Sequence, residues 1–430
     1  MRTSRLGPLA FVVAFLSNAA AASAQQPNPA QAIQQEIDQL KKDFDARLAA
    51  LESRLAALEG RQPAAPAAGA QAPAPTAEVP AGAQGAGGPG GALPIYGNVS
   101  AASKIFNPDM AVIGNFLGAA GKNTINPEPA LQLPESELSL QAIVDPYARA
   151  DFFMSFGEEG VGVEEGYLTF PTLPGGLLAK IGRMRAAFGK VNTLHSHVVP
   201  WTDRPLVTDN LLNGEEGIAD AGISIAGLIP NPWIFLEATG QVFRGDSGDV
   251  FTSNRRSDLS YVGHLRGYHD LGESTNVDVG VSYAHGHNGS GMDGPAGPAD
   301  FKTDLYGADV TLRWRPLRRS IYHSFVGRSE LVFSRRDQPG GQQNSSGFYV
   351  SGDYQLGRRW FTGIRFDRSE RSDDASIHDL GKSFTVTYWP SEFSQIRGQL
   401  RRTEYAEGAT ANEVLFQFQF SIGAHGAHPF

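Results

Sequence analysis

NEVLFQFQFSI, residues 412–422, places an aromatic or aliphatic side chain at every second position near the end of the chain. The alternate positions form an apolar set and a polar set: Phe416, Phe418, Phe420 and Ile422 against Gln417 and Gln419. A period of two residues puts each set on its own face of a β-strand. The stretch therefore predicts a strand with one apolar and one polar face.

The same alternation recurs upstream, and three strands show it clearly. In 146–157, 301–314 and 393–404 the apolar sets are Ala148, Ala150, Phe152, Met154 and Phe156, then Tyr306, Ala308, Val310, Leu312 and Trp314, then Ile396, Gly398 and Leu400. From Leu93 onward the pattern predicts about sixteen strands. The predicted ranges are 95–106, 136–144, 146–157, 162–170, 176–184, 220–229, 233–244, 258–268, 275–285, 301–314, 321–334, 346–356, 359–369, 382–389, 393–404 and 412–422.

The links between these strands carry most of the information about the fold. Short links alternate with long ones, the long ones being 107–135, 185–219, 245–257, 286–300, 335–345 and 370–381. Tight turns at one end and longer loops at the other are typical of outer-membrane barrels. We therefore predict an all-β protein, a transmembrane antiparallel β-barrel with its apolar face toward lipid and its polar face toward a wet lumen. Trp233, Trp360, Trp389, Tyr306 and Tyr388 lie near strand ends, where an aromatic girdle is expected.

Composition agrees with this class. The chain of 430 residues has 50 Gly, 19% charged residues and no Cys, so thiolate chemistry is excluded and a metal would need His or carboxylate ligands. The net charge of −9 argues against a nucleic acid as partner.

The N-terminal part differs from the barrel segment, 93–430. Residues 1–24 have the basic start, apolar run and small-residue cleavage site of a secretory signal. Within 25–60, a stripe from Ile33 to Leu58 with spacings of three and four predicts a coiled-coil helix that associates with itself. Residues 61–92 are rich in Pro, Ala and Gly, which predicts a disordered, extended linker. We expect this N-terminal segment in the periplasm, with the cell wall as another possible contact of the coiled coil.

The link 185–219 is the third long-end loop and is too apolar for a simply solvated loop. By analogy with porins, we expect it to fold inward and narrow the pore. The pore-constriction residues would be Arg183, Arg185, Lys190, Arg204 and Asp203, with Asp209, Glu215 and Glu216 opposing the positive charge. A loop packed over a neighbouring subunit is the alternative. From the polar faces of the strands we expect Arg149, Asp151, Asp309, Arg313, Arg397 and Arg401 in the lumen.

Three histidine pairs lie in the chain: His195 and His197, His285 and His287, and His425 and His428. Two imidazoles on one face of an extended segment are a start for a zinc site, although no third ligand is fixed by spacing. Surface or structural histidines are the alternative, and we expect no resident cofactor unless His195 and His197 bind zinc. The sequence has no G-x-S-x-G, H-E-x-x-H or phosphate-binding glycine loop, so we expect no enzyme.

Two stretches resemble known families. GLLAKIGRMRAAFGK, 176–190, is similar to the K-x-G-x-x-x-x-x-F-G segment of phosphate-selective porins of the O/P type. That resemblance implies a trimeric anion channel of sixteen strands. The runs 145–170 and 195–207 resemble bacterial barrel proteins labelled zinc-regulated TonB-dependent outer membrane receptors. Such receptors have 22 strands and a plug, whereas 25–92 has the pattern of a coiled coil and spacer.

Together these features predict a porin-like channel in the Gram-negative outer membrane, spanning its lipid bilayer as a homotrimer. Small hydrophilic solutes or anions would pass by diffusion, filtered by pore width and lumen charge. A ligand-specific uptake receptor linked to zinc is one alternative, and a structural outer-membrane anchor is another.

Overall fold

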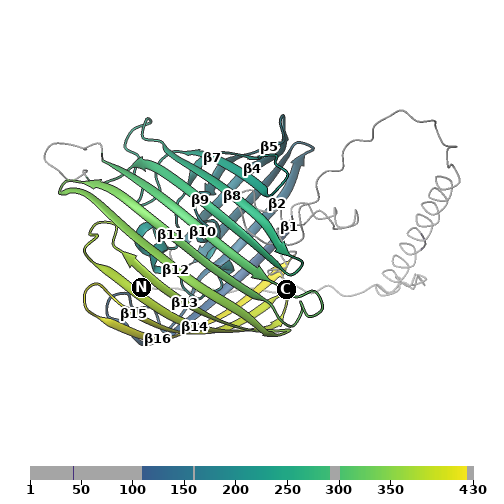
Figure 1. The fold of residues 1–430 in the computed structure, drawn as a ribbon, viewed down its shortest axis with the longest axis vertical. Helices are drawn as coiled ribbons and strands as arrows, with labels where there is room; N and C mark the ends of the chain where they lie inside the picture. Colours follow the sequence, from purple (N-terminus) through teal and green to yellow (C-terminus); the bar gives the residue numbers. More distant parts are fainter. Residues whose placement is uncertain (1–41, 43–108, 158–159, 291–300, 424–430) are drawn as a thin grey trace, which may run out of the picture. The chain divides into compact units, whose positions relative to one another are not determined.

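The computed structural model describes Lys42 and residues 109–157, 160–290 and 301–423. Within them, sixteen antiparallel strands pair in sequence order and form a closed barrel (Figure 1). The strands are β1 (Asp109–Lys122), β2 (Leu131–Asp145), β3 (Ala148–Gly157), β4 (Gly160–Leu173), β5 (Leu177–Arg185), β6 (Ala219–Leu228), β7 (Phe235–Phe243), β8 (Ser260–Gly272), β9 (Thr275–His287), β10 (Lys302–Trp314), β11 (Phe325–Gln338), β12 (Gly341–Gly357), β13 (Trp360–Glu370), β14 (His378–Ser391), β15 (Ser394–Glu404) and β16 (Thr410–Gly423). The prediction of about sixteen strands is confirmed.

The last strand closes the barrel, as its alternation predicts. β16 pairs with β15 on one side and with β1 on the other, where Phe418 lies opposite Phe116. Phe416 is 42% exposed on the outer face, whereas Gln417 is 1% exposed and donates from its side chain to Asn115 Oδ1 at 2.8 Å. The apolar face therefore points away from the lumen and the polar face toward it.

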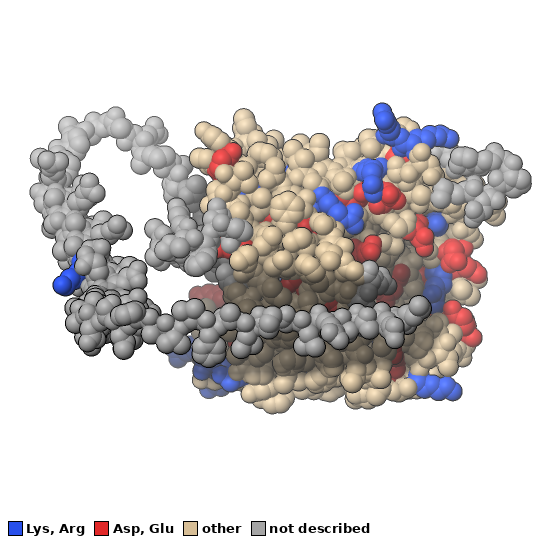
Figure 2. Space-filling model, turned by 180° about the vertical axis from the view of Figure 1, so that it is seen from behind, with Lys and Arg blue, Asp and Glu red and all other residues tan. Residues whose placement is uncertain are grey.

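The other strands sort their faces in the same way. Phe152, Tyr306 and Leu400 are exposed outward, while Asp151, Asp309 and Gln399 are buried inward. Figure 2 shows an outer face made mostly of uncharged residues, with charged ones gathered toward the ends of the barrel. An outward apolar band around a polar interior is the architecture of an outer-membrane barrel.

The first predicted strand is wrong in position. β1 occupies Asp109–Lys122, inside the predicted long link 107–135, whereas 95–106 lies outside the described residues. The run of small residues at the end of β1 hides its alternation. Earlier in β1, Gly114 leaves room for the ring of Phe420 on β16, since a Cβ atom at this position would lie 2.3 Å from that ring. The residue at position 114 is therefore matched to the size of a side chain on the neighbouring strand, which the pattern of a single strand does not show.

A second predicted long link is also wrong. β11 and β12 run through most of 335–345 and leave only residues 339–340 between them, since polar side chains such as those of Arg335 and Gln343 pair across the two strands. The other long links are confirmed at 186–218, 244–259, 288–301 and 371–377. Among the described residues, no helix is long and apolar enough to cross a membrane.

The aromatic girdle is present for four of the five expected residues. Trp233, Trp360 and Tyr306 are exposed, and the rings of Trp360 and Tyr388 lie 4.5 Å apart. Trp389 is buried instead, because it shares the inward parity of Thr385 and Thr387 on β14. The expected signal 1–24, the coiled coil 25–60 (apart from Lys42), the linker 61–92, and the pair His425 and His428 lie outside the described residues.

Candidate functional site

The segment 186–218, here called L3, connects β5 to β6 and folds back inside the barrel. It contains two short 3-10 helices, η3 (Val191–Thr193) and η4 (Ser196–Val198), and one α-helix, α2 (Leu206–Leu211). The helix α2 contacts β11, β12, β13 and β14, on the wall across from the strands that L3 joins. L3 therefore crosses the lumen, as the sequence predicts for its third long-end loop.

An apolar core forms where L3 meets one side of the wall. Phe188, Val191, Trp201, Val207 and Leu211 pack against inward side chains of the strands, namely Phe243, Val262, Ala284, Leu305, Val332 and Tyr349. The rings of Trp201 and Tyr349 meet edge to face at 5.3 Å. An inward apolar wall would be costly beside open water, so these strand residues are explained by the loop that covers them.

A polar clasp holds the middle of L3 to the opposite wall. Asp203 Oδ2 lies 2.9 Å from Arg365 Nη2 and 3.1 Å from Arg401 Nη1, and Oδ1 accepts a hydrogen bond from Gln399 at 2.6 Å. Burial acts to raise the pKa of Asp203, but the two guanidinium groups outweigh it and lower that pKa to about 2. The clasp is therefore fully charged at neutral pH.

Asn192 ties the two stems of L3 together. Its amide nitrogen donates to Ala186 O at 2.9 Å and to Ile218 O at 3.1 Å, and its Oδ1 accepts from Ile218 N at 2.7 Å. Gly217 is needed beside it, because its φ of +63° is left-handed and a Cβ atom would lie 2.3 Å from Asn192 Oδ1. This tie sets where L3 leaves the wall.

Replacing Asn192 with Ala is expected to destabilise the folded protein by about 2 kcal/mol. The substitution leaves the buried Ile218 N–H without its acceptor and removes the second hydrogen bonds to Ala186 O and Ile218 O, each of which still accepts one backbone N–H. Thermal unfolding in detergent, followed by circular dichroism, measures this. The half-buried Asn231, which bonds only within its own turn, is the matched control: Asn231→Ala should change the midpoint little. Equal effects of the two substitutions would contradict the role of Asn192.

Four predicted constriction residues lie in or beside L3, but their charges are engaged. Lys190 Nζ pairs with Asp278 at 3.0 Å and Arg185 Nη2 with Glu164 at 3.3 Å. Arg204 is 3% exposed and donates to Val191 O and Leu194 O. With Asp203 in the clasp, these four groups hold the loop in place. The expectation that Arg204 offers a free positive charge to the lumen does not fit its burial.

Arg183 departs from the expected constriction. It shares the parity of Ile181, which is 48% exposed on the outer face, and its Nε donates to Val163 O on the neighbouring strand. Alternation along β5 therefore points Arg183 away from the lumen.

The six residues expected in the lumen all lie on the inner face. Arg149 pairs with Asp151 at 2.6 Å, and Arg397 donates to Val199 O and Trp201 O of L3. Arg401 joins Asp203 to Glu413. Asp309 is buried, and Arg313 lies 3.9 Å from Asp278. Most of these groups form ion pairs or hydrogen bonds with L3 or with one another.

Two cavities flank L3. One of about 420 Å³ lies between L3 and the β1, β2 and β16 wall, and Asp203, Asp209, Glu215 and Arg401 line it. The other, of about 520 Å³, is lined by the end of α2 and the loops beyond it, including Asp209, Asp249, Arg336 and Arg371. Polar and charged groups on both sides of the loop give solutes an aqueous surface.

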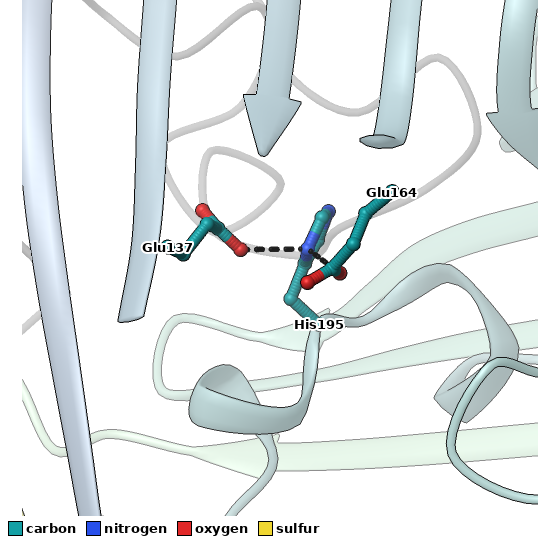
Figure 3. A group of neighbouring side chains, drawn as sticks. All are labelled: Glu137, Glu164 and His195. Atoms are coloured by element: carbon teal, nitrogen blue, oxygen red, sulfur yellow. Dashed lines mark hydrogen bonds and ion pairs between the residues drawn. The ribbon is translucent and has the colours of Figure 1, made fainter. Parts of the chain in front are cut away.

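A cluster of His and Glu side chains lies where L3 touches β2 and β4 (Figure 3). His195 Nδ1 is 2.8 Å from Glu137 Oε2 and 2.9 Å from Glu164 Oε2, and Nε2 is 2.8 Å from Glu165 Oε1. His197 Nδ1 is 3.5 Å from Glu137 Oε2. Burial acts to lower the pKa of His195, but Glu137, Glu164 and Glu165 raise it well above its usual value.

A β-bulge places two of these carboxylates on the same face. Phe153 pairs with Glu165 and Met154 with Val163, so Glu164 is an extra residue in β4. Glu164 and Glu165 therefore both point inward, which simple alternation forbids. The sequence predicts the histidines but not their acidic partners, because the bulge leaves no mark in the hydrophobic pattern. The pair His285 and His287 does not converge in this way: His285 pairs with Asp304 at 2.8 Å.

The chain has both sequence and structural relatives. No family model matches it. A protein of Aquifex aeolicus named "Uncharacterized protein" is 32% identical over 341 residues, covering 71% of each chain. The anion-selective porin from Comamonas acidovorans superposes with a TM-score of 0.51 at 11% identity, over 73% of this chain and 99% of that one. The outer membrane channel DcaP of Acinetobacter baumannii matches with a TM-score of 0.49 at 11% identity, over 74% of this chain and 96% of that one.

At 11% identity the Comamonas porin shows the fold alone, which is the sixteen-stranded porin barrel already seen in the strand order. The sequence relative goes further, because its identity extends over most of both chains. The chain thus belongs to the same family as the Aquifex aeolicus protein.

Proposed function

We propose that the protein is an outer-membrane channel through which small hydrophilic solutes diffuse passively. The observation that carries this proposal is L3, which crosses a closed barrel and leaves cavities lined by charged groups beside it. Pore width and the charges along such a constriction decide which solutes pass. In this scheme Asp203, Arg204 and Arg401 mark the narrow part, since all three line the cavity between L3 and the wall.

The charges left exposed on L3 favour cations. The loop has two basic and four acidic residues, Lys190 and Arg204 against Asp203, Asp209, Glu215 and Glu216. The basic groups are bound to a carboxylate or to carbonyls, whereas the side chains of Glu215 and Glu216 are exposed. Desolvation and the nearby Asp203 raise the pKa of Asp209 to about 8, so its carboxyl group adds little charge at neutral pH. The Comamonas porin is anion-selective, but the free charges here have the opposite sign.

Single-channel recording in a planar lipid bilayer tests both parts of the proposal. In a KCl gradient the reversal potential should indicate a preference for K⁺. The double substitution of Glu215→Gln and Glu216→Gln should reduce that preference, and the difference should shrink as salt screens the charges. Asp246→Asn, at a position 49% exposed by side chain, serves as the control outside L3. A wild-type preference for Cl⁻ would contradict the charge assignment.

The alternatives give different recordings. A structural anchor predicts no conductance, and an uptake receptor predicts saturable binding of one ligand with a closed lumen.

We further propose a homotrimer with the segment before the barrel in the periplasm and a coiled coil at 25–60. Kinship with phosphate-selective porins of the O/P type rests on the 176–190 stretch. Cross-linking in intact membranes distinguishes a trimer from a monomer.

A further inference from the structure

We propose that His195, Glu137 and Glu164 form a binding site for a divalent transition metal that fastens L3 to the barrel wall. One nitrogen and two carboxylate oxygens converge from three separate elements, L3, β2 and β4, and their ligand atoms all lie within 4.8 Å of one another (Figure 3). Imidazole and carboxylate ligands together suit Zn²⁺ and its neighbours in the first row.

The geometry at His195 Nδ1 points to a cation. Two carboxylate oxygens approach this nitrogen, at 2.8 Å and 2.9 Å. A single N–H can point to only one of them, and Glu137 Oε2 is left without a hydrogen bond although Glu137 is 3% exposed. A metal ion in the space between the three atoms would contact all of them. The distance from Nδ1 to each carboxylate oxygen would need to grow by only about half an ångström to match the spacing of ligand atoms around a tetrahedral zinc ion.

The other side of the ring is arranged as metal-binding histidines commonly are. Nε2 lies 2.8 Å from Glu165 Oε1, so its N–H donates to that carboxylate and leaves the Nδ1 lone pair facing Glu137 and Glu164. Glu165 is itself fixed, since its Oε2 accepts the backbone N–H of Arg185 at 3.0 Å. The bulge in β4 makes this division possible, because it turns Glu164 toward Nδ1 and Glu165 toward Nε2.

Charge in the cluster also favours a cation. The inner faces of β2 and β4 bring Glu135, Glu137, Glu164 and Glu165 together, with the Arg185 guanidinium pairing with Glu164. His197 Nδ1, 3.5 Å from Glu137 Oε2, is the nearest further nitrogen that could become a fourth ligand. A metal ion or a proton on His195 would each offset negative charge in this cluster, and these two possibilities give different results when metal is added.

Isothermal titration of Zn²⁺ into the full chain, purified in detergent and stripped with a chelator, tests the site. Wild-type protein should bind one Zn²⁺ per chain, and excess Mg²⁺ should not compete. His195→Ala and the double substitution Glu137→Gln with Glu164→Gln should each abolish saturable binding. Glu165→Gln, which replaces the orienting carboxylate with a neutral amide and removes no ligand, should weaken binding about 10- to 100-fold. Faster gel migration of unboiled samples verifies that each variant is folded.

His285→Ala is the matched control, because His285 also contacts a carboxylate but only Asp304, at 2.8 Å. It should bind Zn²⁺ as the wild type does. Folded wild-type protein that binds no Zn²⁺ would overturn the proposal and assign the cluster to a proton. Binding that survives unchanged in the double glutamine variant, which preserves side-chain size, would also overturn it.

Discussion

Replacing residues 192–212 with a short Gly-Ser linker is expected to raise the single-channel conductance at least about twofold. A barrel of sixteen strands is wide enough for an aqueous channel, and here L3 occupies part of that space. The replacement removes Trp201, Val207 and Leu211 from the lumen together with the clasp residue Asp203. Planar-bilayer recording at high salt measures the change with little contribution from surface charge.

The control for this replacement is an exposed loop segment at the same end of the barrel. Residues 254–257 lie between β7 and β8 and are exposed, and their replacement by the same kind of linker should leave the conductance near the wild-type value. Unchanged conductance after removal of 192–212 would show that L3 is not the narrow part of the channel. In that case the charge preference would need another origin.

The barrel could be predicted from the sequence because its signal is repeated in every strand. Each strand that alternates over several pairs, such as 393–404 and 412–422, lies where the pattern places it. The errors arise where a neighbouring strand affects which residues fit or pair. Gly114 of β1 leaves the space that the ring of Phe420 fills, and polar pairs across β11 and β12 extend those strands into a predicted loop. Neither cause is visible in one strand alone.

The site was predictable only in part. The position of L3 follows from strand count, and its apolar residues indicate that it packs against something. Which charges remain free does not follow from composition, because Arg204 and Arg397 are engaged by backbone carbonyls. The prediction put Arg183 at the pore constriction because it is close to the loop in sequence. Its position along β5, however, decides toward which face of the strand its side chain points. The acidic partners of His195 depend on the bulge at Glu164, which only the pairing of β3 with β4 reveals.

Asp203→Ala is expected to destabilise the protein by about 3 kcal/mol, at the lower end of the cost of breaking a buried ion pair. The cost lies at that end because each guanidinium keeps a second carboxylate: Asp367 for Arg365 at 2.8 Å and Glu413 for Arg401 at 2.8 Å. Thermal unfolding in detergent should show a lower midpoint, and bilayer recording a larger or noisier conductance as the middle of L3 detaches. A matched exposed pair, Arg244 with Asp246 at 2.8 Å, provides the control, and Asp246→Ala should change stability by less than about 1 kcal/mol.

The same clasp predicts how stability depends on pH. The pKa of Asp203 is about 2 in the folded protein and near 4 when the chain is unfolded, so the folded state binds the proton less readily. Its contribution is therefore complete above about pH 4 and is lost as the pH falls through about 2. The stability difference between wild type and Asp203→Ala should therefore narrow as the pH falls below 4. A difference that does not narrow between about pH 4 and pH 2 would mean that another group holds this part of L3.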